Sequence, residues 1–461
     1  MSVAATSKPG VPLEGVWHPT QRGLTVGLVA TMTLFASESL AVSTIMPDIA
    51  KDLGQTGYGA AFSLFFLGSI VGVLVGGPAA DRLGLRVPFL AVCGFFALGL
   101  VIAGLTPSMW LLILGRLFQG FGAGASSPII YAAIGGAYST QGQVRMFAVT
   151  STAWVIPGVV GPGIAGIVSD AFGWRWVFLG LLPLVALAAA LTVPRLTSLT
   201  NDAQTLPFST LDIARFTAGA GLLLTGLSSS NVGAGVALAV TGLALCASCA
   251  SRIFTPGLFR FRRGMAATVG LRGMLTAAFI PVDAFVPLVV TEVRGQSVLV
   301  ASLAVTVATV CWTIGAWVAA RVQERRGAPW LARSGFLLLA TGITIELLIL
   351  VPSVPLAIGI FGGAVGGIGM GLAFAPMSSV VLMLAPEGQQ GTASSSLTLL
   401  DGLGFAFGAA ATGALVTLGS HLSWRTATPF FVAWPLAALL ALAGAMLASR
   451  MHAADELTAT S

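Results

Sequence analysis

Four carboxylates lie inside runs of apolar residues, where acids are rare: Glu38, Asp283, Glu346 and Asp401. In the stretch LFASESLAVSTIMPDIA, residues 34–50, the immediate neighbours of Glu38 are small or apolar. A charge at the centre of a membrane-spanning helix costs about 2.5–3.5 kcal/mol on insertion scales, and such residues usually have a function. Burial favours the neutral form of a carboxyl group, so an acid that water reaches only part of the time can take up and release a proton. These residues predict proton-transfer chemistry within the membrane.

The composition is that of a membrane protein. Of 461 residues, 56% are hydrophobic and only 8% charged, and the mean hydropathy is +0.94. A soluble domain has about 25% charged residues. The net charge of +6 does not indicate nucleic acid, because the basic residues lie in short loops beside apolar runs. Residues 1–23 are polar, so we expect no cleavable signal.

The cysteines predict neither disulfides nor a metal site. Cys246 and Cys249 form a CxxC pair, but no second pair exists and the chain has only three histidines. Packing is the simpler interpretation, and the sequence predicts no cofactor.

Fourteen apolar runs approach the roughly 20 residues that a spanning helix needs. They lie at about 24–46, 59–80, 88–105, 110–135, 146–168, 176–193, two within 215–250, 265–290, 298–320, 331–351, 355–384, 393–417 and 427–449. We therefore predict an all-α polytopic protein in seven parts: a tail (1–23), a six-helix bundle (24–193), a polar linker (194–214), two extra central helices (215–250) that turn near 228–231, a basic loop (251–264), a second six-helix bundle (265–449) and a tail (450–461).

The distribution of basic residues predicts the orientation. With the N-terminus in the cytoplasm, the cytoplasmic segments contain 16 of the 22 Lys and Arg residues and the outer segments contain 4, while Arg116 and Arg272 lie within helices. This asymmetry predicts that both termini are cytoplasmic in the plasma, or inner, membrane.

The two bundles have matching motifs. GFGAG at 120–124 precedes a proline and so does GIGMG at 367–371, while a Trp-Arg pair opens the last helix of each bundle, at 174–175 and 424–425. The offsets are 247 and 250 residues. Repeated halves with a site near the midplane are typical of transporters. We therefore predict two halves related by a pseudo-two-fold axis.

Glu38 and Asp283 are 245 positions apart, close to this offset. We expect them in the first helix of each half, facing each other across a central cavity. Pro281 and Pro287 flank Asp283 and predict a break in its helix, which would free backbone groups to line a cavity. Arg272 points the same way as Asp283 but about 16 Å from it, too far for direct pairing.

Other roles remain open for all four acids. Each could form a structural hydrogen bond to a Ser, Thr or backbone group on a neighbouring helix. Glu346, near the outer end of its run, could also extend to the membrane surface.

A charged, glycine-containing turn, GGPAADRLGLRVPFL at 76–90, joins the second and third helices. We expect Asp81 to accept hydrogen bonds from the start of the following helix, where the dipole favours an anion. The turn resembles the loop motif of the major facilitator superfamily, which gates alternating access, although Leu85 stands where a second basic residue is usual. The matching residues are Gly77, Asp81, Arg82, Gly84 and Arg86.

Two further motifs extend the resemblance. LLILGRLFQGFGAG at 111–124 is similar to the fourth-helix motif, in which the buried Arg116 needs a carboxylate or carbonyl partner and is linked to proton transfer. PGVVGPGIAGIVSDAFGWRWVF at 157–178 resembles the fifth-helix antiporter motif, and it predicts a thin, kinked face that a neighbouring helix can approach. Its matching residues are Gly158, Gly161, Pro162 and Gly166.

With the two extra helices, and with Glu38 nine residues before Pro47, the chain resembles the fourteen-helix drug:proton antiporters, in which Asp is usual at that spot. The resemblance implies a major facilitator fold and proton-coupled export of lipophilic compounds, which we expect to be cationic. Glu38, Asp283, Asp401, Arg116 and Arg272 would couple protons or line the cavity. The implied partners are a small-molecule substrate, protons and lipid, with the protein acting as a monomer.

Alternatives remain. The same machinery could export one endogenous metabolite, such as an amino acid, sugar or lipid, and resistance or physiology could be its role. An importer is disfavoured by the motif at 157–166. An enzyme is disfavoured because HExxH and GxSxG are absent, and a receptor because no large extramembrane domain is evident.

Overall fold

The computed structural model describes residues 16–19, 21–54, 58–196, 209–227 and 232–451. Most of the predicted tails, residues 197–208 of the linker and the predicted turn at 228–231 lie outside these residues.

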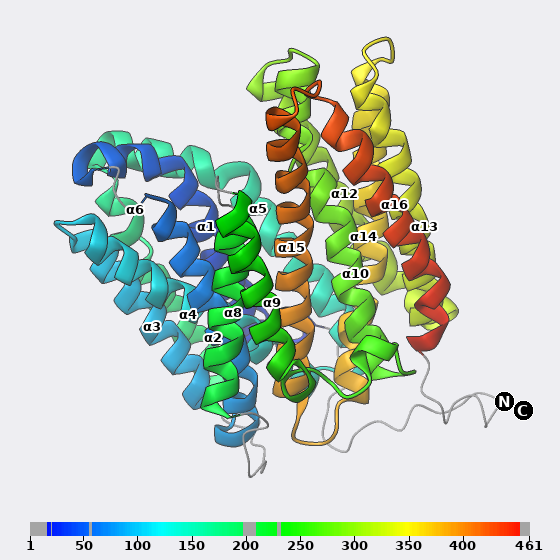
Figure 1. Ribbon diagram of the computed structural model, residues 1–461. Helices are drawn as coiled ribbons and strands as arrows, with labels where there is room; N and C mark the ends of the chain where they lie inside the picture. The colour runs from blue at the N-terminus through cyan, green and yellow to red at the C-terminus, as the bar shows by residue number, and fades with distance from the viewer. Residues whose placement is uncertain (1–15, 20, 55–57, 197–208, 228–231, 452–461) are drawn as a thin grey trace, which may run out of the picture. The chain divides into compact units, whose positions relative to one another are not determined.

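The described chain is almost entirely helical (Figure 1). It clusters into two compact units, of which the first takes in the described part of Met1–Leu206 with Ala385–Ser395, and the second that of Pro207–Leu384 with Ser396–Ser461. The elements are α1 (Arg22–Leu53), α2 (Tyr58–Leu83), α3 (Arg86–Leu105), α4 (Met109–Ala137), α5 (Thr140–Phe172), α6 (Arg175–Leu179), α7 (Leu182–Leu196), α8 (Thr210–Leu227), α9 (Val232–Ile253), η1 (Leu258–Arg260), α10 (Met265–Asp283), α11 (Val286–Leu288), η2 (Val289–Val293), α12 (Val298–Arg326), α13 (Ala328–Glu346), η3 (Leu347–Leu350), α14 (Leu356–Leu384), α15 (Gln390–His421), α16 (Thr428–Leu447) and η4 (Ala448–Met451).

Each predicted apolar run coincides with helix. Two runs are subdivided: 176–193 is interrupted at Gly180 between α6 and α7, and 265–290 is interrupted after Asp283. By length and apolar composition, ten helices among the described residues could cross a membrane, or eleven if the two bent segments of α1 count as one span. The chain is therefore a multi-pass membrane protein, while the full count of fourteen crossings remains a prediction.

In the first unit, glycines bring helices α2 and α4 close together. An added Cβ at Gly68, Gly72, Gly120 or Gly124 would collide with a backbone carbonyl of the facing helix, that of Ser69 in the case of Gly124. Small residues at such positions allow backbones to approach within membranes, where helix association depends on close packing. The GFGAG segment is therefore a packing surface that fixes α4, the helix of Arg116, against α2.

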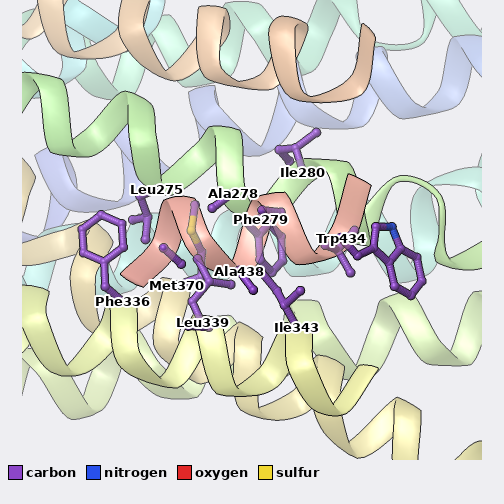
Figure 2. Packing of buried hydrophobic residues seen from close by; sticks show 14 of the residues in the cluster. Leu275, Ala278, Phe279, Ile280, Phe336, Leu339, Ile343, Met370, Trp434 and Ala438 are labelled. Atoms are coloured by element: carbon purple, nitrogen blue, oxygen red, sulfur yellow. The ribbon is translucent and has the colours of Figure 1, made fainter. Parts of the chain in front are cut away.

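The second unit has an apolar core built from α10, α13, α14 and α16 (Figure 2). Phe336, Met370 and Trp434 are fully buried within it. Gly335 and Gly369 lie where a Cβ would press on the opposite backbone, so α13 and α14 are also held together by glycine contacts.

The predicted break beside Asp283 is confirmed. Helix α10 ends at Asp283, and the chain continues through α11 into a π-helical turn, η2. The Phe285 amide donates to the Val282 carbonyl, and the Trp434 indole donates to the Pro281 carbonyl over 3.2 Å. Tertiary contact therefore satisfies a backbone group at the proline break, as buried carbonyls require.

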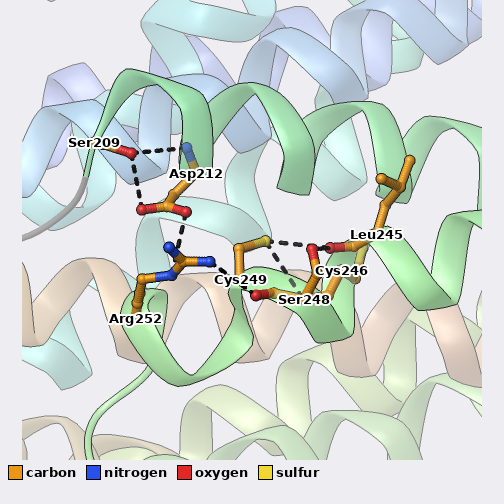
Figure 3. Close-up of polar contacts among 7 residues, drawn as sticks. All are labelled: Ser209, Asp212, Leu245, Cys246, Ser248, Cys249 and Arg252. Atoms are coloured by element: carbon orange, nitrogen blue, oxygen red, sulfur yellow. Dashed lines mark hydrogen bonds and ion pairs between the residues drawn. The ribbon is translucent and has the colours of Figure 1, made fainter.

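The central helices α8 and α9 form an antiparallel hairpin. Gly219 faces Gly242, and Gly226 faces Gly235, with no room for a Cβ at either crossing. At one end, Arg252 lies 3.4 Å from Asp212, and the Ser209 hydroxyl donates to the same carboxylate over 2.9 Å (Figure 3). The two predicted central helices are thus present as a pair that packs on itself.

Replacing Gly124 by leucine should destabilise the first unit, because the side chain would collide with the α2 backbone at Ser69. Overpacking of this kind lowers stability by roughly 1–3 kcal/mol. The measurement is thermal unfolding in detergent. Gly94→Leu is the matched control, since nothing lies within 4 Å of a Cβ at that exposed position. Equal melting temperatures for the two variants would contradict the proposed packing role.

Candidate functional site

Glu38 forms an ion pair with Arg116 inside the first unit. The Arg116 Nη1 group donates to Glu38 Oε1, and the two side chains are only 1% and 2% exposed. Glu38 lies on α1 and Arg116 on α4, 78 residues apart in the chain. A buried guanidinium leaves a large desolvation cost uncompensated unless a carboxylate neutralises it. The sequence predicts a carboxylate or carbonyl partner for Arg116, and in the structure the partner is the Glu38 carboxylate.

Two further groups hold the Arg116 guanidinium in place. Its Nη1 also donates to Gln119 Oε1, one helical turn further along α4, over 2.9 Å. The Phe65 ring of α2 lies 4.2 Å from the guanidinium carbon, a cation–π distance. Glu38 Oε2 is buried and has no hydrogen-bond partner within the described part of the chain. This oxygen keeps its lone pairs free to accept a proton.

The second unit contains an analogous pair. Arg272 Nε, on α10, lies 2.6 Å from Asp401 Oδ1, on α15. Arg272 is fully buried, while 18% of the Asp401 side chain is exposed. The Arg272 Nη1 group donates to the Phe374 carbonyl and the Ser378 hydroxyl over 2.7 and 2.9 Å. The Phe374 ring also lies 3.0 Å from the guanidinium carbon. Each unit thus has one buried arginine between a carboxylate and a phenylalanine.

Asp283 stands apart from this network. It lies with Glu346 at a small cavity of the second unit. Glu346 is only 7% exposed and so does not extend outward along the surface of its unit. Glu38 and Asp283 belong to different units, and their facing arrangement stays a prediction.

Asp81 binds a different helix terminus from the one expected. Its Oδ1 accepts from the Gly391 amide, and its Oδ2 accepts from the amide and hydroxyl of Thr392, all over 2.7 Å. These donors open α15, within Ala385–Ser395 of the first unit. The prediction that Asp81 would cap the following helix was wrong, because α2 continues past Asp81 to Leu83. The three hydrogen bonds place a carboxylate where the α15 dipole favours an anion.

The rest of the loop motif supports this contact. A Cβ at Gly77 would collide with the Gly391 carbonyl, so glycine permits the close approach. Gly84 has a positive φ of 72°, which suits the tight turn between α2 and α3. Arg82 and Arg86 are exposed beside the turn.

Comparison with known sequences decides the family. The sequence model of the Major Facilitator Superfamily matches residues 26–282, more than half of the chain. This chain belongs to the Major Facilitator Superfamily. As a superfamily member it is a membrane transporter of small molecules rather than an enzyme.

Individual relatives agree. The chain is 26% identical to the "Multidrug resistance protein B homolog" of Mycobacterium tuberculosis, over 86% of this chain and 77% of that protein. It is 24% identical to the transporter YebQ of Escherichia coli, over 91% of this chain and 95% of that protein. The crystal structure of the human organic anion transporter MFSD10 superposes with a TM-score of 0.71, covering 94% of this chain and all of that one at 14% identity. The last comparison establishes the major facilitator fold alone.

The fifth-helix motif lies on an uncovered face of α5. A Cβ at Gly158 or Gly166 would meet no atom within 4 Å, and one at Gly161 would meet only Pro157 of the same helix. No helix of the first unit packs against these glycines among the described residues. Pro162 lies in the same helix. The superfamily role of this motif stays a prediction.

Several residues of the site were not found from sequence. Phe65, Phe374 and Ser378 contact the buried arginines, but each resembles ordinary core packing within an apolar run. In the CxxC pair, the Cys246 thiol donates to the Phe216 carbonyl. The Cys249 thiol donates to the carbonyls of Leu245 and Cys246 on α9 (Figure 3).

Removing either member of the Glu38–Arg116 pair should destabilise the first unit more than removing both. Arg116→Met or Glu38→Gln leaves a buried polar group without its partner, which typically lowers the free energy of unfolding by about 3–5 kcal/mol. The double variant should recover much of this loss. Denaturant unfolding in detergent measures the free energy of unfolding of the parent, the two single variants and the double variant. The half-exposed Arg175–Asp52 pair, measured in the same way, is the control and should show little coupling. Additive losses at Glu38 and Arg116 would show that the pair is not coupled.

Replacing Asp81 by alanine should loosen the start of α15, because three hydrogen bonds lose their acceptor. Unsatisfied buried donors cost about 1–3 kcal/mol. Hydrogen exchange in residues 385–395 should accelerate and the melting temperature should fall. Asp48→Ala is the control, since that carboxylate is 44% exposed and, among the described residues, pairs with Lys51 and Ser169. Unchanged exchange in Asp81→Ala would contradict the capping role.

Proposed function

We propose that this chain exports lipophilic, cationic compounds in exchange for protons. The name of the Mycobacterium tuberculosis relative, a multidrug resistance protein homolog, supports the export of drugs, while the positive charge of the cargo is inferred from Glu38. The fifth-helix motif, with Gly158, Gly161, Pro162 and Gly166, favours export over import. The observation that carries the proposal is the buried Glu38–Arg116 pair, whose carboxylate keeps one oxygen free.

In this proposal the positive charge of Arg116 takes the place of the substrate's positive charge beside Glu38 when no substrate is bound. With no cargo present, the guanidinium neutralises Glu38 and so offsets the cost of burying its charge. A cationic compound that reaches the pair competes with Arg116 for the same carboxylate. In this proposal the substrate specificity is broad, because binding requires only a positive charge on the compound and apolar side chains around the site.

A proton then releases the cargo. Its arrival on Glu38 Oε2 converts the carboxylate to a neutral acid and removes the attraction for the bound cation. Two unit charges 4 Å apart at an effective dielectric constant of about 20 attract by about 4 kcal/mol, so neutralisation weakens binding by roughly a thousandfold. When the proton leaves, Arg116 pairs with Glu38 again. At this site one proton enters for each cation exported.

The Arg272–Asp401 pair has a related role in the second unit. In this proposal Asp401, whose side chain is 18% exposed, exchanges protons more readily than Glu38, whose side chain is 1% exposed. Asp283 is the remaining acid of the proposed coupling set. Asp81, with Gly77, Arg82, Gly84 and Arg86, would control the conformational step of alternating access.

The proposal also includes the oligomeric state, the membrane and the topology of the protein. The chain would act as a monomer in the plasma, or inner, membrane with both termini in the cytoplasm, which is the side that the 16 to 4 distribution of basic residues predicts. It would cross the bilayer fourteen times.

Reconstitution in liposomes tests the function. With an imposed pH gradient, the parent should move an ethidium-like dye against its concentration gradient, and Glu38→Gln should reduce this transport at least about tenfold because the site can no longer change charge. Glu38→Asp keeps the carboxyl group and should retain a substantial part. Glu324→Gln makes the same change at an exposed position on α12 and should transport like the parent.

Two outcomes would overturn this assignment. Gradient-driven transport that persists in folded Glu38→Gln would remove Glu38 from the coupling mechanism. Transport of a single amino acid, sugar or lipid with no dye movement would identify a dedicated metabolite exporter instead.

A further inference from the structure

The second unit contains a pair of acids with no arginine between them. Asp283 is the last residue of α10, and Glu346 is the last residue of α13. Both line one small cavity, whose other walls are apolar side chains, including Phe279 and Ile343, and two glycines of α14. Two acidic residues, each at the end of its helix, therefore line one cavity with otherwise apolar surroundings.

The size of the cavity restricts what it can hold. Its volume is about 10 Å³, and a cavity needs about 10–15 Å³ on this measure for a single water molecule. A lipophilic cation is far too large. The cavity has room for a proton, with or without one water molecule.

The surroundings provide Glu346 with no counter-charge. Glu346 is more than nine-tenths buried, and within the described ranges the side chains of Glu346 and Asp283 form no hydrogen bond or ion pair. Arg272, on the same helix as Asp283, is engaged with Asp401. Arg294 of the neighbouring segment donates to the carbonyls of Ile349, Val351 and Val354.

Among the described residues, the other helices packed around the cavity supply no nearby counter-charge for Glu346. Helices α14 and α16 contain no charged residue. Arg333 of α13 is 13 positions before Glu346, and the charged residues of α12 begin 13 positions after the cavity residue Ala308. At 1.5 Å per residue each separation is about 20 Å. Glu292, on η2, is exposed.

The fold makes room for the Glu346 carboxyl group. A Cβ added to Gly363 would lie 3.1 Å from Glu346 Oε1, which is closer than ordinary van der Waals contact. The glycine therefore provides the space into which the acid points. Gly363 and Glu346 both line the cavity, so the acid is directed toward Asp283 rather than away from it.

We propose that Asp283 and Glu346 form a proton-binding site of their own, in which the two carboxyl groups share a proton directly or through one water. Two unpaired carboxylates that share a site cannot both remain ionised, so at least one keeps its proton while the cavity is dry. Water that enters the cavity solvates the charged forms and lets the proton leave. This site deepens the proposed export function and rests on it, because Asp283 belongs to the proposed coupling set, but its proton binding can be tested without transport.

Infrared difference spectroscopy on the full-length protein in lipid tests the site without transport. The parent should show a carbonyl band of a protonated carboxylic acid that shifts in heavy water and responds to a change of pH. Glu346→Gln and Asp283→Asn should each remove the same band, because the proton is shared. Glu292→Gln should leave the band unchanged.

A second variant distinguishes an effect on the proton site from a loss of the fold. Gly363→Ala keeps both acids but crowds Glu346 Oε1, so the band should move while the protein stays folded. An unchanged spectrum in both Glu346→Gln and Gly363→Ala would overturn the proposal. A band that responds to sodium chloride, but not to choline chloride, at constant pH would overturn the proton assignment in favour of a small metal cation.

Discussion

A guanidinium inside an apolar helical unit requires a carboxylate within reach, and much of this structure depends on that requirement. Arg116 and Arg272 are among the largest fully buried side chains of the described chain. Each draws an acid from another helix, Glu38 from α1 and Asp401 from α15. Since removing one partner of such a pair leaves a charge that the surroundings cannot solvate, the pairs fix which helices can neighbour one another within each unit.

The helical framework could be predicted because its signals are local. Apolar runs, prolines beside Asp283 and glycine-rich segments are readable in sequence, and the helices and the break after Asp283 follow them. The need of Arg116 for a carboxylate or carbonyl partner was equally predictable, since the cost of an unpaired buried charge holds in any fold.

The choice of partners could not be predicted, because it depends on tertiary structure. Four intramembrane acids were candidates for Arg116, and only the packing of α1 against α4 selects Glu38. Asp81 binds amides 310 and 311 residues away, although the nearest helix terminus in sequence follows it directly. Glu346 and Asp283 line one cavity, in which Gly363 leaves space for the Glu346 carboxyl group, and no spacing in the chain reveals this.

The α8–α9 hairpin is held together by contacts between its own two helices. Its glycines face each other, Asp212 binds Arg252, and the Cys246 thiol of α9 binds a carbonyl of α8. Two antiparallel helices that both cross the bilayer, as the sequence predicts here, return the chain to the side from which it departed. Such a pair can be inserted or removed without reversing the sidedness of the segments that follow it.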